Sequence, residues 1–274
     1  MSLHEQVTVA AGLPPRLEVR NPAGSVTVQA VEGADQLEVW VEPLNEAAEE
    51  LLDDVEIDVR EFDSGSPARL RVTVPERRLL RTAAFAVRIT TPAGAGARIA
   101  VASADVDLAG RFGALEVTGA SGDLDVGRGT DVHVRTASGD VRIGTVDGGA
   151  SIGSASGDVR VGRANGAVKL RTASGDVSVE AAAADALIST ASGDVTVGAA
   201  TGGAVQVKTV SGDISVGVAP GLRVWLDLAS VSGRMHSELE GDGPGGDGPP
   251  ALTLTLRSVS GDLRIHPAAP APVS

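Results

Sequence analysis

The sequence predicts an all-β protein: a single elongated β-solenoid of short parallel strands, with about 18 residues per coil and one short N-terminal helix. Two observations carry this prediction. Ser-Gly-Asp recurs at a nearly constant spacing in the second half of the chain, and aliphatic residues alternate with polar residues on both sides of each copy. A fixed period is typical of repeat architectures, and alternation with period two is typical of strands that have one buried face.

The repeat is defined by the serine of each Ser-Gly-Asp copy. Counting two degenerate copies, the spacings between successive serines are 18, 17, 18, 18, 18, 19, 21 and 28 residues. The full copies begin at Ser121, Ser138, Ser156, Ser174, Ser192, Ser211 and Ser260, and the degenerate ones at Ser103 and Ser232. We expect equivalent strands of successive coils to pair in parallel about 4.8 Å apart.

Each copy lies between two short aliphatic strands. Around Ser174 these are Val168 and Leu170 before the motif, and Val177 and Val179 after it. The apolar positions change from even to odd offsets across the motif, so the chain turns a corner there. Glycine permits unusual backbone angles at such a corner, and Ser and Asp side chains bond to nearby backbone amides. Gly-rich segments half a period later predict a second corner.

Residues 16–102 lack the motif but keep the alternation, which predicts a β-rich capping segment continuous with the solenoid. A cap is needed because an open end exposes unpaired backbone. The predicted strands are 17–20, 25–31, 36–43, 55–61, 69–74, 85–91 and 97–103. A helix is predicted over 45–54, with Asn45 as its N-cap and an apolar stripe that includes Ala47, Ala48 and Leu52.

The Ser-Gly-Asp repeat occupies residues 103–265, and its longest spacing contains "GDGPGGDGPP" at 241–250. Glycine and proline at this density do not form a coil, so the segment is predicted to be a loop insertion. Residues 1–15 are predicted to be a flexible N-terminus, and residues 266–274, rich in Pro and Ala, a disordered tail.

Composition excludes several function classes. With 42% hydrophobic residues the 274-residue chain can bury a core, but only 2% are aromatic, which argues against surfaces that stack sugars or bases. A net charge of -13 repels phosphate backbones, so nucleic acid is not an expected partner. No segment resembles a signal peptide or a membrane span, and we therefore expect a cytoplasmic protein without direct membrane insertion.

If the corners stack, their aspartates form a column of carboxylates. Its members are Asp123, Asp140, Asp158, Asp176, Asp194, Asp213 and Asp262. One alternative is a cation-binding edge, because hard cations take several carboxylate oxygens, but one carboxylate per coil supplies few ligands. Two charges about 4.8 Å apart repel by about 0.9 kcal/mol in water, which a turn hydrogen bond of about 1 kcal/mol offsets. We therefore interpret the column as a structural corner ladder and predict no metal ligands.

No catalytic residues are predicted. The repeated serines would need a positioned base to act as nucleophiles, and the four histidines, His4, His133, His236 and His266, occupy no fixed place in the repeat. The chain has no cysteine, which removes disulfides, thiolate metal sites and cysteine nucleophiles together. The sequence thus predicts a protein that is not an enzyme and uses no cofactor.

Several segments resemble a known bacterial family. They are "NPAGSVTVQAVEGADQLEVWVEP", "EAAEELLDDVEIDVRE", "AVRITTPAGAGARIAVAS" and the recurrent "TASGDV" and "TVSGDI". Together they are similar to the β-strand-repeat proteins of a domain-of-unknown-function family related to Toastrack domains and classed as candidate adhesins. The resemblance covers roughly residues 16–265 and supplies no catalytic residues.

We expect a non-enzymatic scaffold or interaction module that binds a protein partner, whose identity the sequence does not give. Two alternatives remain open. One, implied by the resemblance, is an adhesin or envelope-stress signalling module at the cell surface, and the other is the cation-binding edge. The sequence predicts neither the handedness of the coil nor the oligomeric state.

Overall fold

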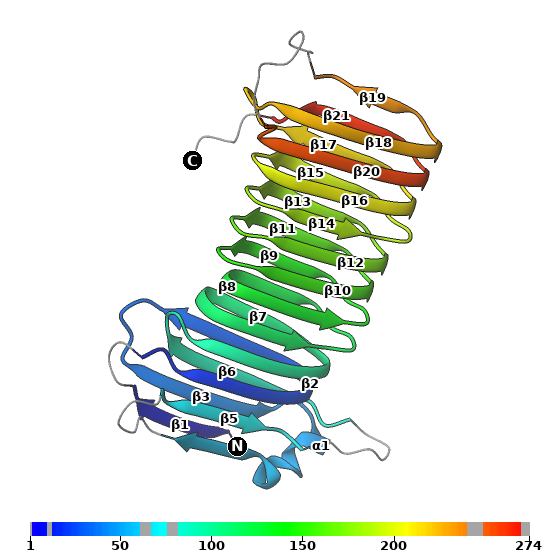
Figure 1. The fold of residues 1–274 in the computed structure, drawn as a ribbon. Helices are drawn as coiled ribbons and strands as arrows, with labels where there is room; N and C mark the ends of the chain where they lie inside the picture. Colours follow the sequence, from blue (N-terminus) through cyan, green and yellow to red (C-terminus); the bar gives the residue numbers. More distant parts are fainter. Residues whose placement is uncertain (1, 10–12, 61–66, 76–81, 240–248, 270–274) are drawn as a thin grey trace. The chain divides into compact units, whose positions relative to one another are not determined.

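The structure is a computed structural model that describes residues 2–9, 13–60, 67–75, 82–239 and 249–269. These residues form 21 strands, one short α-helix and one 3-10 turn (Figure 1). The fold is all-β, with mostly parallel strands in a solenoid-like arrangement, as the repeat predicts. The chain divides into two compact units, Met1–Arg142 and Ile143–Ser274. Most of the predicted insertion (241–248) and of the tail (270–274) lies outside the described residues.

The N-terminal unit is organised around β2 (Arg16–Val31), a long strand that bends at a corner. Its first half pairs in parallel with β5 (Arg69–Thr73), and its second half with β6 (Phe85–Pro92). On its other side β2 pairs in parallel with β7 (Gly96–Thr118), which in turn pairs with β8 (Leu124–Thr136). Because β2 and β7 continue through a corner, each of them contributes its first half to one sheet face of the unit and its second half to the next.

Not all strands of this unit are parallel, in contrast to the prediction. β3 (Gln36–Pro43) runs antiparallel to β6, and β1 (Leu3–Thr8) antiparallel to β3. β4 (Glu56–Arg60) and β5 pair antiparallel, because the residues between them are too few for the crossover that a parallel pair needs. Within the segment predicted to be a flexible N-terminus, 1–15, residues Leu3–Thr8 form the strand β1. The His4 ring stacks on Trp40 with a centroid distance of 4.6 Å, which helps to fix β1 against β3.

The predicted helix over 45–54 is shorter in the structure. α1 spans Glu46–Glu49, and the side chain of Asn45 accepts a 2.9 Å hydrogen bond from the Ala48 N–H, as expected of an N-cap. A separate 3-10 turn, η1 (Leu52–Asp54), follows. Its acidic residues and the absence of a basic residue from the last turn of α1 disfavour a longer helix, since the C-terminal end of a helix dipole is stabilised by cations.

The core of the N-terminal unit contains the largest buried side chains of the described residues, Phe85 and Phe112, both with 0% exposure. Asn21 is also fully buried, at the corner of β2. Its Nδ2 donates to the carbonyl oxygens of Phe85 at 2.9 Å and Ser25 at 3.0 Å. This side chain therefore ties the corner of β2 to the start of β6.

The C-terminal unit consists of short strands that pair in parallel, and β9 (Val141–Val146) spans the boundary between the units. The others are β10 (Ala150–Ser156), β11 (Val159–Ala164), β12 (Val168–Ser174), β13 (Val177–Ala182), β14 (Ala186–Ser189), β15 (Val195–Ala200), β16 (Gly203–Ser211), β17 (Ile214–Val218), β18 (Val224–Ser232), β19 (Met235–Ser237), β20 (Leu252–Ser260) and β21 (Leu263–Pro267). Even-numbered strands β10 to β16 stack on one another, and odd-numbered strands β11 to β17 do the same. In each stack the buried aliphatic residues are in register: Val159, Val177, Val195 and Ile214 form one such row.

The last two coils lie in the opposite order to their sequence. β16 pairs with β20, and β20 pairs with β18 on its other side; β17, β21 and β19 follow the same order. The inner strand β20 buries its aliphatic face, whereas the outer strand β18 is partly exposed. Leu252, Leu254 and Leu256 of β20 are at most 1% exposed, whereas Leu226 of β18 is 36% exposed. Strand β21 extends to Pro267, within the segment predicted as a disordered tail.

Candidate functional site

The Ser-Gly-Asp corners need glycine for two separate reasons. Gly175 has φ of 120° and Gly193 has φ of 131°, in the left-handed region that other residues rarely adopt. A Cβ atom on Gly175 would also overlap the carbonyl oxygen of Gly157 in the adjacent corner. The corners therefore stack so closely that no side chain fits at this position.

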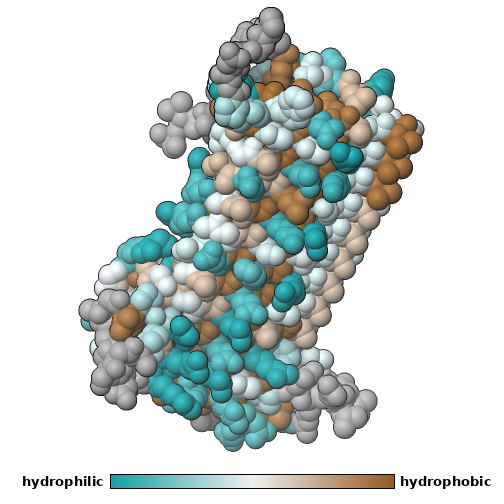
Figure 2. All heavy atoms as spheres, viewed as in Figure 1, coloured by the Kyte–Doolittle hydropathy of each residue, from teal (hydrophilic) through white to brown (hydrophobic). Residues whose placement is uncertain are grey.

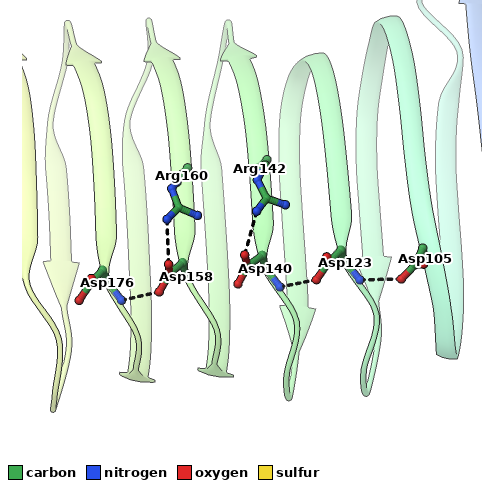
Figure 3. A network of polar contacts seen from close by, with 7 residues as sticks. All are labelled: Asp105, Asp123, Asp140, Arg142, Asp158, Arg160 and Asp176. Carbon is green, nitrogen blue, oxygen red and sulfur yellow. Dashed lines mark hydrogen bonds and ion pairs between the residues drawn. The ribbon is translucent and has the colours of Figure 1, made fainter.

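In the N-terminal unit the corner aspartates form a hydrogen-bonded ladder (Figure 3). The backbone N–H of Asp123 donates to Oδ1 of Asp105 at 3.0 Å, and the N–H of Asp140 donates to Oδ1 of Asp123 at 2.9 Å. Each carboxylate thus bonds to the backbone of the next corner, whereas the motif alone predicted bonds within the same turn.

The same bond recurs through the C-terminal unit. The donor and acceptor pairs are Asp176 to Asp158, Asp194 to Asp176, Asp213 to Asp194 and Asp262 to Asp213, with N···O distances of 3.0, 2.9, 2.8 and 2.7 Å. The ladder ends where the N–H of Arg234 donates to Oδ1 of Asp262 at 2.8 Å. Asp105 and Arg234, both in degenerate copies of the motif, are therefore ladder members that the prediction omitted.

Arginine side chains partly neutralise the ladder. Arg142 lies 2.8 Å from Oδ2 of Asp140, and Arg160 lies 2.8 Å from Oδ2 of Asp158 (Figure 3). At the end of the ladder Arg234 lies 3.3 Å from Oδ2 of Asp262. Oδ2 of each of these three aspartates faces a cation, while Oδ1 of Asp158 and of Asp262 accepts a backbone N–H, so the repulsion between neighbouring carboxylates is reduced.

The described residues contain no group of three or more His, Cys, Asp or Glu side chains arranged to hold a metal ion. Hydrogen bonds from Arg111 and Arg264 lower the pKa values of Glu32 and Glu238, respectively. Both glutamates belong to surface ion pairs, and a lowered pKa keeps a carboxylate ionised, which is the opposite of what a general acid requires. The arrangement of the ladder fixes strand register and corner geometry.

A second row of polar bonds was not predicted from the sequence. The Oγ1 atoms of Thr172, Thr190 and Thr209 donate to the carbonyl oxygen of the serine two residues later, at 3.0, 3.0 and 3.1 Å. These threonines are 5–7% exposed, so the bonds satisfy hydroxyl groups that would otherwise be buried without a partner. The signal was present in the sequence as a Thr or Ser two positions before every full-motif serine except Ser121.

The histidines occupy unrelated places. His4 stacks on Trp40, and His133 lies on the exposed face of β8, as its position between two buried valines predicts. His236 Nε2 lies 3.7 Å from Glu238, the partner of Arg264. His266 Nδ1 lies 2.8 Å from the Pro267 carbonyl oxygen. No hydrogen bond among the described residues joins a histidine to a motif serine.

Exposed hydrophobic side chains collect at the corner of the last strands of the C-terminal unit. The register places Val259 of β20 between Val210 of β16 and Val231 of β18. Their exposures are 49%, 56% and 83%, respectively, and we call these three residues the valine corner. Other copies of the motif have alanine at this position. Figure 2 shows a hydrophobic edge on the part of this unit that contains the last strands.

The described residues include no helix with the length and hydrophobicity needed to cross a bilayer. No curated protein matches the chain. Three similar solved structures are a candidate lipid-binding protein from Parabacteroides distasonis ATCC 8503, a candidate adhesin from Bacteroides fragilis NCTC 9343 and a candidate adhesin from Parabacteroides distasonis ATCC 8503. Their identities are 12%, 14% and 12%, and their TM-scores 0.47, 0.44 and 0.35. The alignments cover 96%, 97% and 96% of this chain and 96%, 96% and 97% of the other chains.

The family model is more informative than these distant structures. The model of Toastrack DUF4097 matches residues 17–266, which include the N-terminal β-rich segment and every full copy of Ser-Gly-Asp. This range agrees with the resemblance seen in the sequence. The chain therefore belongs to the Toastrack DUF4097 family.

Proposed function

We propose that this protein is a non-enzymatic scaffold that binds another protein through the valine corner. The observation that carries the proposal is the exposure of Val210, Val231 and Val259 in adjacent strands. Contiguous exposed apolar surface marks interaction sites in soluble proteins. Alanine occupies the same corner position in other coils, so the larger side chain is not required by the corner itself.

The backbone around the valine corner is fixed before any partner binds. The Asp213–Asp262 ladder bond and the Thr209 hydroxyl bond lie beside it. Parallel pairing of β16, β20 and β18 spaces successive corner side chains by about 4.8 Å. A row held in this way loses little conformational entropy on binding, which favours affinity.

Further apolar side chains lie on the same terminal strands. Trp225 of β18 is 62% exposed and Met235 of β19 is 55% exposed. Tryptophan and methionine are enriched at protein interfaces, where a few such anchors supply most of the binding energy. These residues support a protein partner over a polar or charged ligand at this end of the unit.

The test is affinity purification of the tagged protein from its native cells, after crosslinking, with identification by mass spectrometry. The variant Val210→Ser/Val231→Ser/Val259→Ser removes the valine corner, and Ala155→Ser/Ala173→Ser/Ala191→Ser is the matched control at the same corner position. We expect one reproducible protein partner with the wild type and the control, but not with the valine variant.

Two outcomes would contradict the proposal: no specific partner, or a partner retained equally by all three proteins. Repeating the purification with a chelator tests the cation-binding alternative, which predicts loss of the partner. Recovery only in the envelope fraction, without a protein partner, would support the adhesin alternative instead.

A further inference from the structure

An open groove of ≈ 760 Å³ crosses the strands of the N-terminal unit on its outer face. Its floor includes Gly96 and Ala114, which carry no side chain or only a methyl group. Arg16 and Arg69 line one end, and Asp131, His133 and Arg135 of β8 line the other. The volume falls within the range typical of small-molecule sites.

One row of outward side chains beside the floor is electrically balanced. Arg71 of β5 lies 2.9 Å from Glu18 of β2. Arg98 lies 2.7 Å from Glu116, which follows one coil later in the same long strand, β7. The register places these residues on neighbouring strands with alternating charges. Every arginine in this row therefore already has a carboxylate partner.

The adjacent row is not balanced. Arg16 of β2 and Arg69 of β5 face each other directly in the register, about 4.8 Å apart at the backbone. The next positions are Gly96 and Ala114, and the carboxylate of this row, Asp131 of β8, lies beyond Ala114, three strand positions from Arg16. Within the described part of the chain neither arginine makes an ion pair or a side-chain hydrogen bond. Like charges placed directly opposite each other on paired strands are destabilising.

We propose that Arg16 and Arg69 bind the phosphate group of a small phosphate monoester, with the rest of the ligand lying over Gly96 and Ala114. Arginine binds phosphate through paired hydrogen bonds. A phosphate monoester carries a charge of about -1.5 to -2 at neutral pH, which matches the two guanidinium charges, whereas one carboxylate would neutralise only half of them. This site lies in the N-terminal unit and is independent of the valine corner.

Binding is tested by titrating the full chain with inorganic phosphate and with glucose 6-phosphate, at constant ionic strength, while recording arginine Nε–Hε resonances by NMR. We expect saturable shifts of the Arg16 and Arg69 resonances. Acetate at the same ionic strength should bind more weakly. Shifts spread over many arginines without saturation would overturn the proposal.

Two variants separate the binding pair from its neighbours. Arg16→Gln/Arg69→Gln should lose roughly tenfold or more in phosphate affinity, because two charge-assisted contacts are removed. Arg88→Gln, in the same unit but outside the groove lining and paired with Glu42, is the control and should bind as the wild type does. Equal affinity of all three proteins would overturn the assignment. Without phosphate the double variant should be at least as stable to heat as the wild type, since the repulsion is gone.

The position of the ligand body is tested at Gly96. A Cβ atom there would lie 3.5 Å from the Ala114 carbonyl oxygen, an ordinary contact, so Gly96→Val should fold normally and fill the floor. Inorganic phosphate should still bind to this variant, whereas glucose 6-phosphate should bind several-fold more weakly. Unchanged binding of glucose 6-phosphate would contradict the placement over the floor.

Discussion

The two units of the chain hold parallel strands together in different ways. In the C-terminal unit one set of contacts recurs from coil to coil: a left-handed glycine, an aspartate that binds the next backbone N–H, and a buried hydroxyl group. In the N-terminal unit these corner contacts occur only towards its end, as at Asp123, and its core also depends on residues that occur once, such as the buried Asn21 and the rings of Phe85 and Phe112.

This difference predicts different responses to mutation. In a repeat each coil contacts only its neighbours, so damage stays local and stability is close to a sum over coils. A unit with single large core residues has no equivalent contacts elsewhere to compensate for their loss. Substitutions should therefore unfold the N-terminal unit as a whole and the C-terminal unit in part.

The largest effect is expected in the core of the N-terminal unit. Phe85→Ala should lower the free energy of unfolding by about 4 kcal/mol, because the fully buried ring leaves a cavity. Urea denaturation followed by circular dichroism measures the loss, and hydrogen exchange should show faster exchange throughout residues 16–118. Protection that falls only next to residue 85 would show that this unit also responds locally.

Gly175→Ala should cost about 3 kcal/mol, since the left-handed backbone is strained and the new Cβ overlaps the Gly157 carbonyl oxygen. The control is Gly221→Ala, where φ is 79° but nothing lies within 4 Å of the added atom; it should cost about 1 kcal/mol. Hydrogen exchange should increase only in the strands beside residue 175. Equal losses in the two variants would mean that close stacking of the corners contributes nothing.

Asp194→Ala should cost about 1.5 kcal/mol, because the Asp213 N–H loses its acceptor. Asp194→Asn keeps an oxygen in place and should cost less than half as much. Chemical denaturation of both variants distinguishes the hydrogen bond from the charge: if Asn is as damaging as Ala, the charge dominates. The same pair of substitutions at Asp123 asks whether the ladder works equally in the N-terminal unit.

A smaller effect, about 1 kcal/mol, is expected for Thr190→Val, which keeps the shape but removes the bond to the Ser192 carbonyl oxygen. Thr190→Ser retains the hydroxyl group and serves as the control. Thermal unfolding should rank wild type above Ser, and Ser above Val. If Thr190→Val is as stable as the wild type, the threonine hydrogen bonds do not contribute to the stability of the C-terminal unit.

The smallest effect concerns pH. The hydrogen bond from Arg264 lowers the pKa of Glu238 below its usual 4.5 in the folded state, so the stabilisation is present above pH 4.5 and is lost as the pH falls through the folded-state pKa. The difference in melting temperature between the wild type and Arg264→Gln should therefore vanish in acid. Glu32 and Arg111 provide the equivalent pair in the N-terminal unit. A difference that persists in acid would contradict the ion-pair explanation.

The corners were predictable from the sequence because backbone geometry restricts residue type there. The constant spacing by itself places Gly175 and Asp194 in stacked corners. The partner of each aspartate was not predictable, since a carboxylate can bond within its own turn or to the next coil, and only the stacking distance decides. The threonine bonds were predictable in principle, because Thr172 and Thr190 recur at a fixed offset.

Strand direction and strand order were beyond the sequence. Alternation of apolar residues is the same in parallel and antiparallel strands, so the direction of β3 was not encoded in its pattern. β18 and β20 likewise have the same alternation, with aliphatic residues at equivalent positions, so the pattern does not set their order. The groove was missed because Arg16, Arg69 and Gly96 are far apart in sequence and carry no motif.

The exchanged order of the last coils has a consequence for how the chain is made on the ribosome. Strands β10 to β17 can join the stack in the order in which they emerge, but β18 and β19 cannot take their final places until β20 and β21 have been synthesised. If β20 and β21 are absent from a growing or truncated polypeptide, one coil is missing. The coils on both sides of it, β16–β17 and β18–β19, then lack their native neighbour.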